Sequence, residues 1–95
     1  VLTGNSVLST VGKGIQIKEG ANARMGVATL SSGTVTVNNT SVTNDTRICL
    51  TRVSGTGANA GFVSYTINSG TSFTINSTNA SDDSIYNWLL IEPAP

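Results

Sequence analysis

Apolar and polar residues alternate with a period of two along most of this chain. Successive side chains of a β-strand point to opposite faces, so this alternation indicates strands with one buried face. No stretch carries a sustained helical apolar repeat, and no helix longer than a turn or two is expected. The pattern predicts seven short strands, over residues 14–18, 26–30, 34–37, 47–53, 62–67, 72–75 and 86–91.

Clusters of Gly, Asn, Asp and Ser separate the predicted strands and favour turns. Short strands about 8 to 12 residues apart, with turns between them, are typical of antiparallel sandwiches and jelly rolls. The sequence therefore predicts one all-β, jelly-roll-like sandwich domain over residues 13–95. Residues 1–12 are expected to form an N-terminal arm or linker.

Two segments, residues 31–50 and 68–90, share one pattern: a turn, a short strand, a loop of Asn, Ser and Thr, then an apolar strand. A composition rich in Thr and Asn can produce this likeness by itself. Two quasi-equivalent strand pairs in one sandwich would also produce it, and we favour that interpretation. Two copies do not make a solenoid, which needs at least three repeats.

The composition limits how a chain of 95 residues can be stabilised. Cys49 is the only cysteine and there is no histidine, so neither an intrachain disulfide nor a zinc site is expected. Oligomerisation is the remaining common source of stability for so small a core. Cys49 alternates within the stretch RICLTRV and is predicted to be a small apolar core residue.

Charge and hydropathy exclude several classes of partner. Five basic and five acidic residues cancel, so no broad field attracts nucleic acid or an acidic membrane. No apolar run approaches the roughly 20 residues that cross a bilayer, and no membrane insertion is expected.

Catalytic equipment is missing from the sequence. Without histidine, the commonest general base is absent. Asp82 and Asp83 are expected to be solvated in a loop, and nothing supports a glycosidase dyad between Glu19 and Glu92. The acidic clusters also lack the ligand spacing of a calcium loop. We therefore expect no enzyme, no catalytic residue, no cofactor and no metal.

Candidate interaction residues come from the strand pattern. Alternation places three side chains of the last predicted strand on one face, either core or subunit interface: Tyr86, Trp88 and Leu90. Arg47 and Arg52 have opposite parity in their strand and should face different sides, so one can point along a subunit contact, where arginine is enriched. Tyr65 is the candidate for exposed surface recognition.

Four pieces of sequence occur in an order that resembles a known module: ATL-x-x-GTVTV at 28–37, V-T-x-x-T-R-I-x-L-T at 42–51, GTSFTI at 70–75 and W-L-x-I-E-P at 88–93. Together they resemble the small C-terminal β module of tailed-bacteriophage virion surface proteins, over roughly residues 13–93. The resemblance implies a jelly-roll-like domain, commonly trimeric, displayed on the phage particle. It brings no catalytic motif.

The leading hypothesis is therefore a homotrimeric, non-enzymatic domain of a tail fibre, tail spike or head fibre on the virion surface. Its partners would be other virion proteins, such as major capsid or tail proteins, and a host-surface glycan. The alternative is a capsid decoration (cement) protein that stabilises the phage head. A third hypothesis is a monomeric carbohydrate-binding module, which predicts an exposed Trp or Tyr platform.

Overall fold

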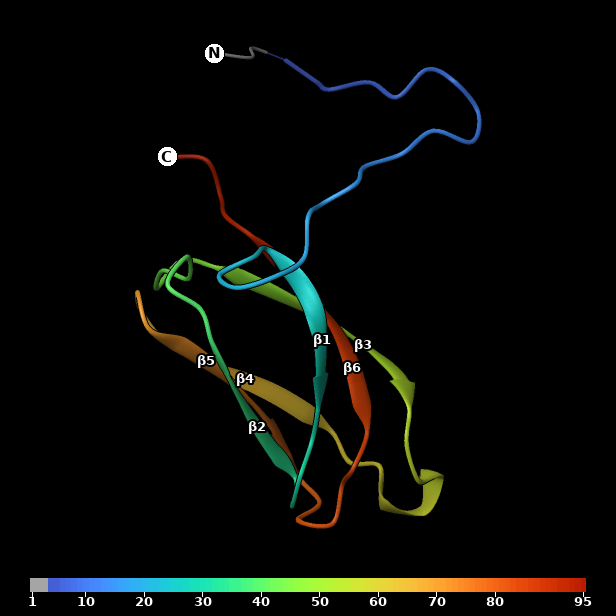
Figure 1. Ribbon diagram of the computed structural model, residues 1–95, viewed down its shortest axis with the longest axis vertical. Helices are drawn as coiled ribbons and strands as arrows, with labels where there is room; N and C mark the ends of the chain where they lie inside the picture. The colour runs from blue at the N-terminus through green and yellow to red at the C-terminus, as the bar shows by residue number, and fades with distance from the viewer. Residues whose placement is uncertain (1–3) are drawn as a thin grey trace.

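Six strands form two antiparallel sheets of three strands each in the computed structural model, which describes residues 4–95 (Figure 1). The first three residues of the predicted arm lie outside this range. The all-β fold class is confirmed, and the short 3-10 turn η1 is the only helical element among the described residues. The elements are β1 (Met25–Thr29), β2 (Thr34–Asn38), β3 (Arg47–Ser54), η1 (Gly57–Asn59), β4 (Val63–Asn68), β5 (Ser72–Ser77) and β6 (Ile85–Ile91).

The chain crosses repeatedly between the two sheets. Sheet A has the strand order β1-β6-β3 and sheet B the order β2-β5-β4, so the first three strands alternate between sheets (Figure 1). Strands β4 and β5 form a hairpin whose turn places Gly70 at a φ of 72° and closes with Thr71 N–H donating to Asn68 O at 3.0 Å. A left-handed conformation at this loop position favours glycine.

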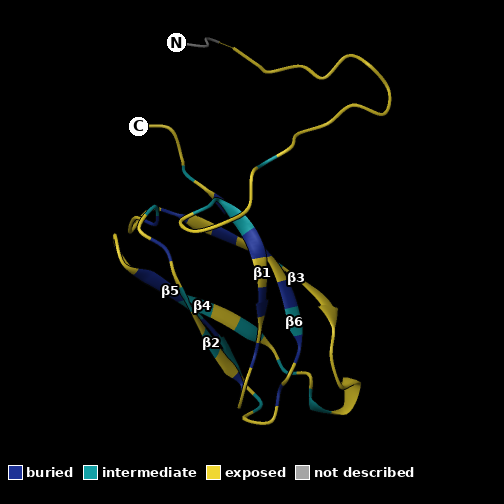
Figure 2. Cartoon of the chain, in the orientation of Figure 1, coloured by how far each residue is buried: buried dark blue, intermediate teal, exposed yellow. Residues whose placement is uncertain are grey.

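The apolar core lies between the sheets. Buried positions alternate with exposed ones along the strands (Figure 2), as the period of two predicts. Six further apolar side chains, half-buried, pack against this core. The buried members are Ala28, Leu30, Val42, Ile48, Phe73, Ile75, Tyr86, Trp88 and Leu90.

The internal sequence likeness corresponds to two crossings from sheet B to sheet A. One segment supplies β2 and β3, and the other supplies β5 and β6. Strand β2 pairs antiparallel with β5, and β3 pairs antiparallel with β6. The two segments are therefore quasi-equivalent strand pairs in one sandwich, the interpretation favoured from the sequence.

Two expectations about local structure were wrong. Residues 14–18 form no strand, because no strand of the described part of the chain pairs with them. Cys49 is exposed rather than buried. Its neighbours Ile48 and Leu50 take the core-facing positions of β3, and the alternation then turns the thiol outward.

Candidate interaction surface and its polar support

The outer face of sheet B is entirely polar. Thr34 Oγ1 donates to Asn76 Oδ1 at 3.1 Å, and the hydroxyls of Thr36 and Thr74 lie 3.0 Å apart. An antiparallel sheet with one solvated face is expected to show this pattern. The face consists of three cross-strand rows: Thr34–Asn76–Ser64, Thr36–Thr74–Thr66 and Asn38–Ser72–Asn68.

Apolar side chains predominate on the outer face of sheet A, although the polar residues Asn87 and Thr51 share a row with Val27. Val27 is 59% exposed and Ile91 is 49% exposed, whereas Met25 and Leu89 are half-buried beside them. The register places Met25, Leu89 and Cys49 side by side across the three strands. We call this surface the A-face and define it by Met25, Val27, Cys49, Ile85, Leu89 and Ile91.

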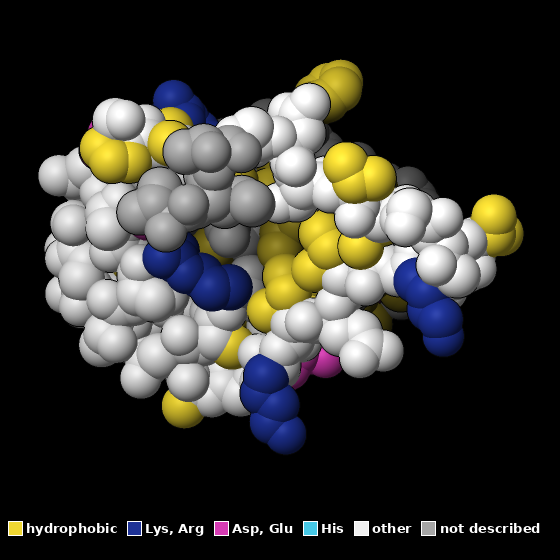
Figure 3. Space-filling view, turned by 90° about the horizontal axis from the view of Figure 1, so that it is seen from above, with side chains coloured by type: hydrophobic (Ala, Val, Ile, Leu, Met, Phe, Trp, Pro, Cys, Tyr) yellow, Lys and Arg dark blue, Asp and Glu magenta, His cyan; other side chains and the backbone are white. Residues whose placement is uncertain are grey.

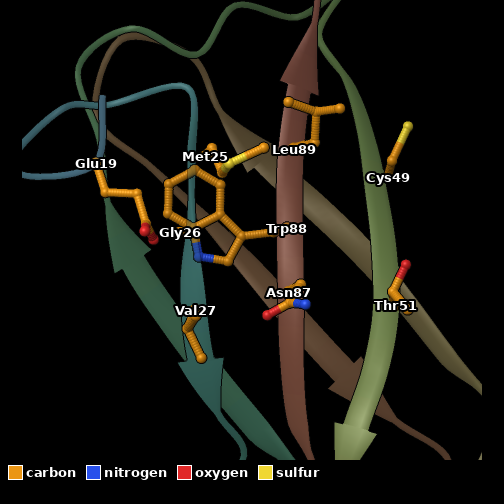
Figure 4. Close-up of a pocket in the computed structure, with 9 residues that line it drawn as sticks. All are labelled: Glu19, Met25, Gly26, Val27, Cys49, Thr51, Asn87, Trp88 and Leu89. Atoms are coloured by element: carbon orange, nitrogen blue, oxygen red, sulfur yellow. The ribbon is translucent and has the colours of Figure 1, made fainter. Parts of the chain in front are cut away.

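Two shallow depressions adjoin each other on the A-face and share Met25 and Leu89. The first encloses about 400 Å³, with Glu19 on its β1 side and Cys49 on its β3 side (Figure 4). The second is bounded by the side chains of Ile15, Ile17, Arg24 and Glu92 and by the ends of β1 and β6. Neither carries an arrangement of groups for acid–base or nucleophilic chemistry.

Trp88 lies beneath the first depression, in the core. It is 6% exposed and packs edge-on against Phe73, with ring centroids 5.1 Å apart and an interplanar angle of 72°. Its partner across the β1–β6 ladder is Gly26, where an added Cβ would lie 2.5 Å from the Trp88 Cζ2 atom. The Trp88 Nε1 atom is buried without a hydrogen-bond acceptor among the described residues.

Tyr86 and Leu90 lie in the core with Trp88, and burial raises the pKa of the Tyr86 phenol. Arg52 occupies the core-facing register position opposite Tyr86, and its Nε donates to Ser84 Oγ at 2.9 Å. Arg47 lies opposite Ile91 and is exposed, so the two arginines face different sides as their parity predicts.

Tyr65 is half-buried and packs against the core, contrary to the exposed position expected for a recognition residue. Its register partner Ile75 is fully buried and belongs to the face of sheet B that covers the core. The alternation of β4 therefore turns Tyr65 inward. The ring is not a free stacking platform for a sugar.

Asp82 is not solvated, which corrects the expectation from the sequence. Its side chain is fully buried and accepts four hydrogen bonds. Oδ1 accepts from the Ser84 N–H at 2.9 Å and from Ser84 Oγ at 2.5 Å. Oδ2 accepts from the Gly61 N–H at 3.0 Å and from Ser77 Oγ at 2.7 Å. The carboxylate therefore joins the β3–β4 loop, the end of β5 and the start of β6.

These hydrogen bonds, from Ser84 above all, then from Ser77 and Gly61, hold the pKa of Asp82 well below its usual range. Arg52 Nε donates to the Ser84 hydroxyl, and that hydroxyl in turn donates to Asp82 Oδ1. Asp83 is exposed as expected, and Oδ1 and Oδ2 accept from Thr56 N–H and Oγ1. These bonds also lower the pKa of Asp83.

Glu92 has a structural role at the opposite end of sheet A. Its Oε1 accepts from Thr46 Oγ1 at 2.7 Å and from Thr43 Oγ1 at 3.0 Å, and it lies 3.5 Å from Arg24 Nη1. The Thr46 hydroxyl is the main cause of the lowered pKa of Glu92. This carboxylate therefore joins the β2–β3 loop to the end of β6.

A local signal for Asp82 does exist in the sequence. Asn39 makes the same contacts, because its Oδ1 accepts from the Ser41 N–H at 2.9 Å and from Ser41 Oγ at 2.6 Å. Both are Asx residues followed two positions later by serine, a pattern that favours a local turn. Asn44 and Thr46 fit a similar pattern, yet Asn44 is exposed. The pattern finds the turn but not its burial.

Within residues 4–95, no group of three or more His, Cys, Asp or Glu side chains is placed to hold a metal ion. The described part of the chain also contains no helix long and apolar enough to cross a membrane.

Two antiparallel sheets around one core, with an apolar outer face on only one of them, define a small β-sandwich module. The family model for the C-terminal domain of K1 capsule-specific polysaccharide lyases matches residues 22–91, and the chain belongs to this family. The match supports, in general form, the resemblance to a C-terminal module of phage tail proteins. Comparisons with the curated proteins and with the solved structures found no match.

Proposed function

We propose that this chain is a non-enzymatic, homotrimeric module at the C-terminal end of a phage tail spike or fibre, displayed on the virion. The observation that carries the proposal is the family match over residues 22–91, which includes every strand. The family name links the module to a lyase specific for a capsular polysaccharide. In our proposal, another region of the spike acts on a surface polysaccharide and this module supports its assembly.

The contacts of the acidic residues favour a structural role. The carboxylates of Asp82, Asp83 and Glu92 each accept hydrogen bonds that join loops to strands. Their lowered pKa values keep them ionised near neutral pH, which does not suit a general acid. Cys49 has no histidine partner, since the sequence contains none.

A tail location is favoured over a capsid decoration protein because the matched family is named for a lyase rather than for a head protein. A monomeric carbohydrate-binding module is disfavoured by the placement of the aromatic rings. Trp88 is buried and Tyr65 packs against the core, so neither forms an open platform for a sugar ring. Contact with a host glycan, as part of the trimer, is retained in the proposal.

Light scattering on a gel-filtration peak tests the assembly. The expected mass is about three times the 9.7 kDa of one chain. A mass of one chain at all concentrations would contradict the trimer. Gold-labelled antibody against the domain tests its location on phage particles. Label on the heads instead of the tails would support a capsid decoration protein and contradict the tail location.

A further inference from the structure

We propose that the A-face is the self-association surface of this protein and that a second copy of the chain covers it. The leading segment, residues 4–24, of one copy would lie across the A-face of the next. This inference rests on the proposed function only for the number of copies in the assembly.

The contrast between the two outer faces is the first observation. Sheets A and B belong to one sandwich, and the outer rows of sheet B contain only Thr, Ser and Asn. On sheet A the equivalent positions include Met25, Val27, Leu89 and Ile91. A contiguous apolar patch on only one of two solvent-facing sheets marks an interaction site.

The leading segment is the second observation. It contains half of the exposed large apolar side chains of residues 4–95: Val7, Leu8, Val11 and Ile15, at 76%, 60%, 101% and 79% exposure. Much of this segment extends away from both sheets (Figure 1). The chain therefore carries an uncovered apolar segment as well as an uncovered apolar face. A second copy of the chain would bury both the apolar segment and the apolar face.

Unpaired backbone groups also favour a second copy of the chain as the occupant of the A-face. Residues 14–18 have the alternation of a strand but form no ladder, and within residues 4–95 β1 and β3 each have one unpaired edge in sheet A. An extended segment can add to such an edge and place alternate side chains on the adjoining face. Ile15 and Ile17 already border the second depression of the A-face. A strand predicted from the sequence would then form between chains rather than within one.

Charge favours another copy over a strongly charged partner. Glu19 lies on the β1 side of the first depression and Arg47 on the outer end of β3, so opposite charges flank opposite margins of the face. In a head-to-tail contact, Glu19 of one copy can meet Arg47 of the next, and such contacts close into rings. The chain has no net charge, so copies do not repel one another.

Seen from the end where the leading segment departs, hydrophobic side chains gather between basic ones (Figure 3).

Cys49 offers a direct test, because the only thiol of the chain is exposed and lies on the A-face. The reaction rate of the wild-type thiol with a maleimide probe is measured across a protein concentration series, alongside the mass by light scattering. We expect the rate to fall at least about tenfold as the assembly forms, since a covered thiol reacts only after dissociation.

Variants locate the surface. The double substitution Val27→Thr with Ile91→Thr keeps β-branched shape at two exposed positions and should raise the dissociation constant at least about tenfold. Val11→Thr with Ile15→Thr should act in the same direction through the leading segment. Phe62→Thr is the control, because Phe62 is 87% exposed but lies outside the A-face. Thermal melts of each variant establish that it is folded.

The outcomes separate this surface from the proposed trimer. A trimer in which Cys49 reacts at the monomer rate would overturn the A-face proposal and leave the assembly intact. A chain that stays monomeric at every concentration would overturn both. Protection of Cys49 by an added oligosaccharide, with the mass unchanged, would assign the face to carbohydrate instead.

Discussion

Replacing Gly26 with alanine should destabilise the fold by crowding one aromatic ring. The added Cβ would lie 2.5 Å from Trp88 Cζ2 and 2.8 Å from Trp88 Cε2. The ring cannot simply retreat, because the fully buried Phe73 packs edge-on against it at 5.1 Å. Gly26 does not have the left-handed φ that alanine would find strained, so the destabilisation comes from steric conflict with the indole.

The expected size of the effect follows from two opposing contributions. Overpacking a close-packed core costs about 1–3 kcal/mol. Replacing glycine removes conformational freedom from the unfolded chain and returns about 0.4–1 kcal/mol. We therefore expect Gly26→Ala to lower the free energy of unfolding by about 1.5 kcal/mol. For a domain of this size that corresponds to a fall in Tm of about 6 to 12 °C.

Thermal unfolding followed by circular dichroism measures the effect, with Gly57→Ala as the matched control. No atom lies within 4 Å of a Cβ built on Gly57, so the control should melt close to wild type. Trp88→Phe removes the crowded indole atoms, and the combined variant Gly26→Ala with Trp88→Phe should cost less than the sum of the two single changes. Wild-type melting of Gly26→Ala, or strictly additive costs, would refute this account of the contact.

Three further predictions concern the core and the carboxylates. Trp88→Ala should lower the free energy of unfolding by about 3 kcal/mol or more in denaturant titration, and a wild-type midpoint would contradict its place in the core. Asp82→Asn should destabilise the fold at pH 7, because each carboxylate oxygen accepts from a backbone N–H and an amide leaves one of them facing NH₂. Asp83→Asn is its control, since the Thr56 hydroxyl can turn to donate or accept; equal melting of the two variants would refute the distinction. Asp82, Asp83 and Glu92 all have lowered pKa values, so their stabilisation is present above the unfolded pKa of about 4 and is lost as pH falls through the folded values. A melting temperature independent of pH between about 5 and 2 would contradict this.

Strand positions were largely predictable because one buried face imposes an alternation that is visible along the chain. Six of the seven predicted strands exist within a residue or two of their expected ends. The seventh, over residues 14–18, has the same alternation but lacks a neighbouring strand. A ladder needs a partner edge, and alternation alone does not reveal whether the same chain provides one.

The polar sites were less predictable. Asp82 and Asp83 are adjacent, have the same charge and occupy one Asn- and Ser-rich stretch. One is fully buried with four donors and the other is exposed, because the β3–β4 loop folds back so that the Gly61 N–H meets Asp82. These partners lie far apart in sequence. The local Asx-x-Ser pattern indicates a turn at Asp82, but it does not indicate that this carboxylate is buried.

By itself, the sequence determined the β-sandwich class, the common face of Tyr86, Trp88 and Leu90, and the absence of a histidine that could act as a general base. Those properties depend on side-chain alternation and on composition, which are local. Only the tertiary structure decided that this common face is core, that Cys49 points outward, and that sheet A rather than sheet B has an apolar exterior. Which face of a strand is covered depends on the sheet packed against it, and that sheet is assembled from distant parts of the chain.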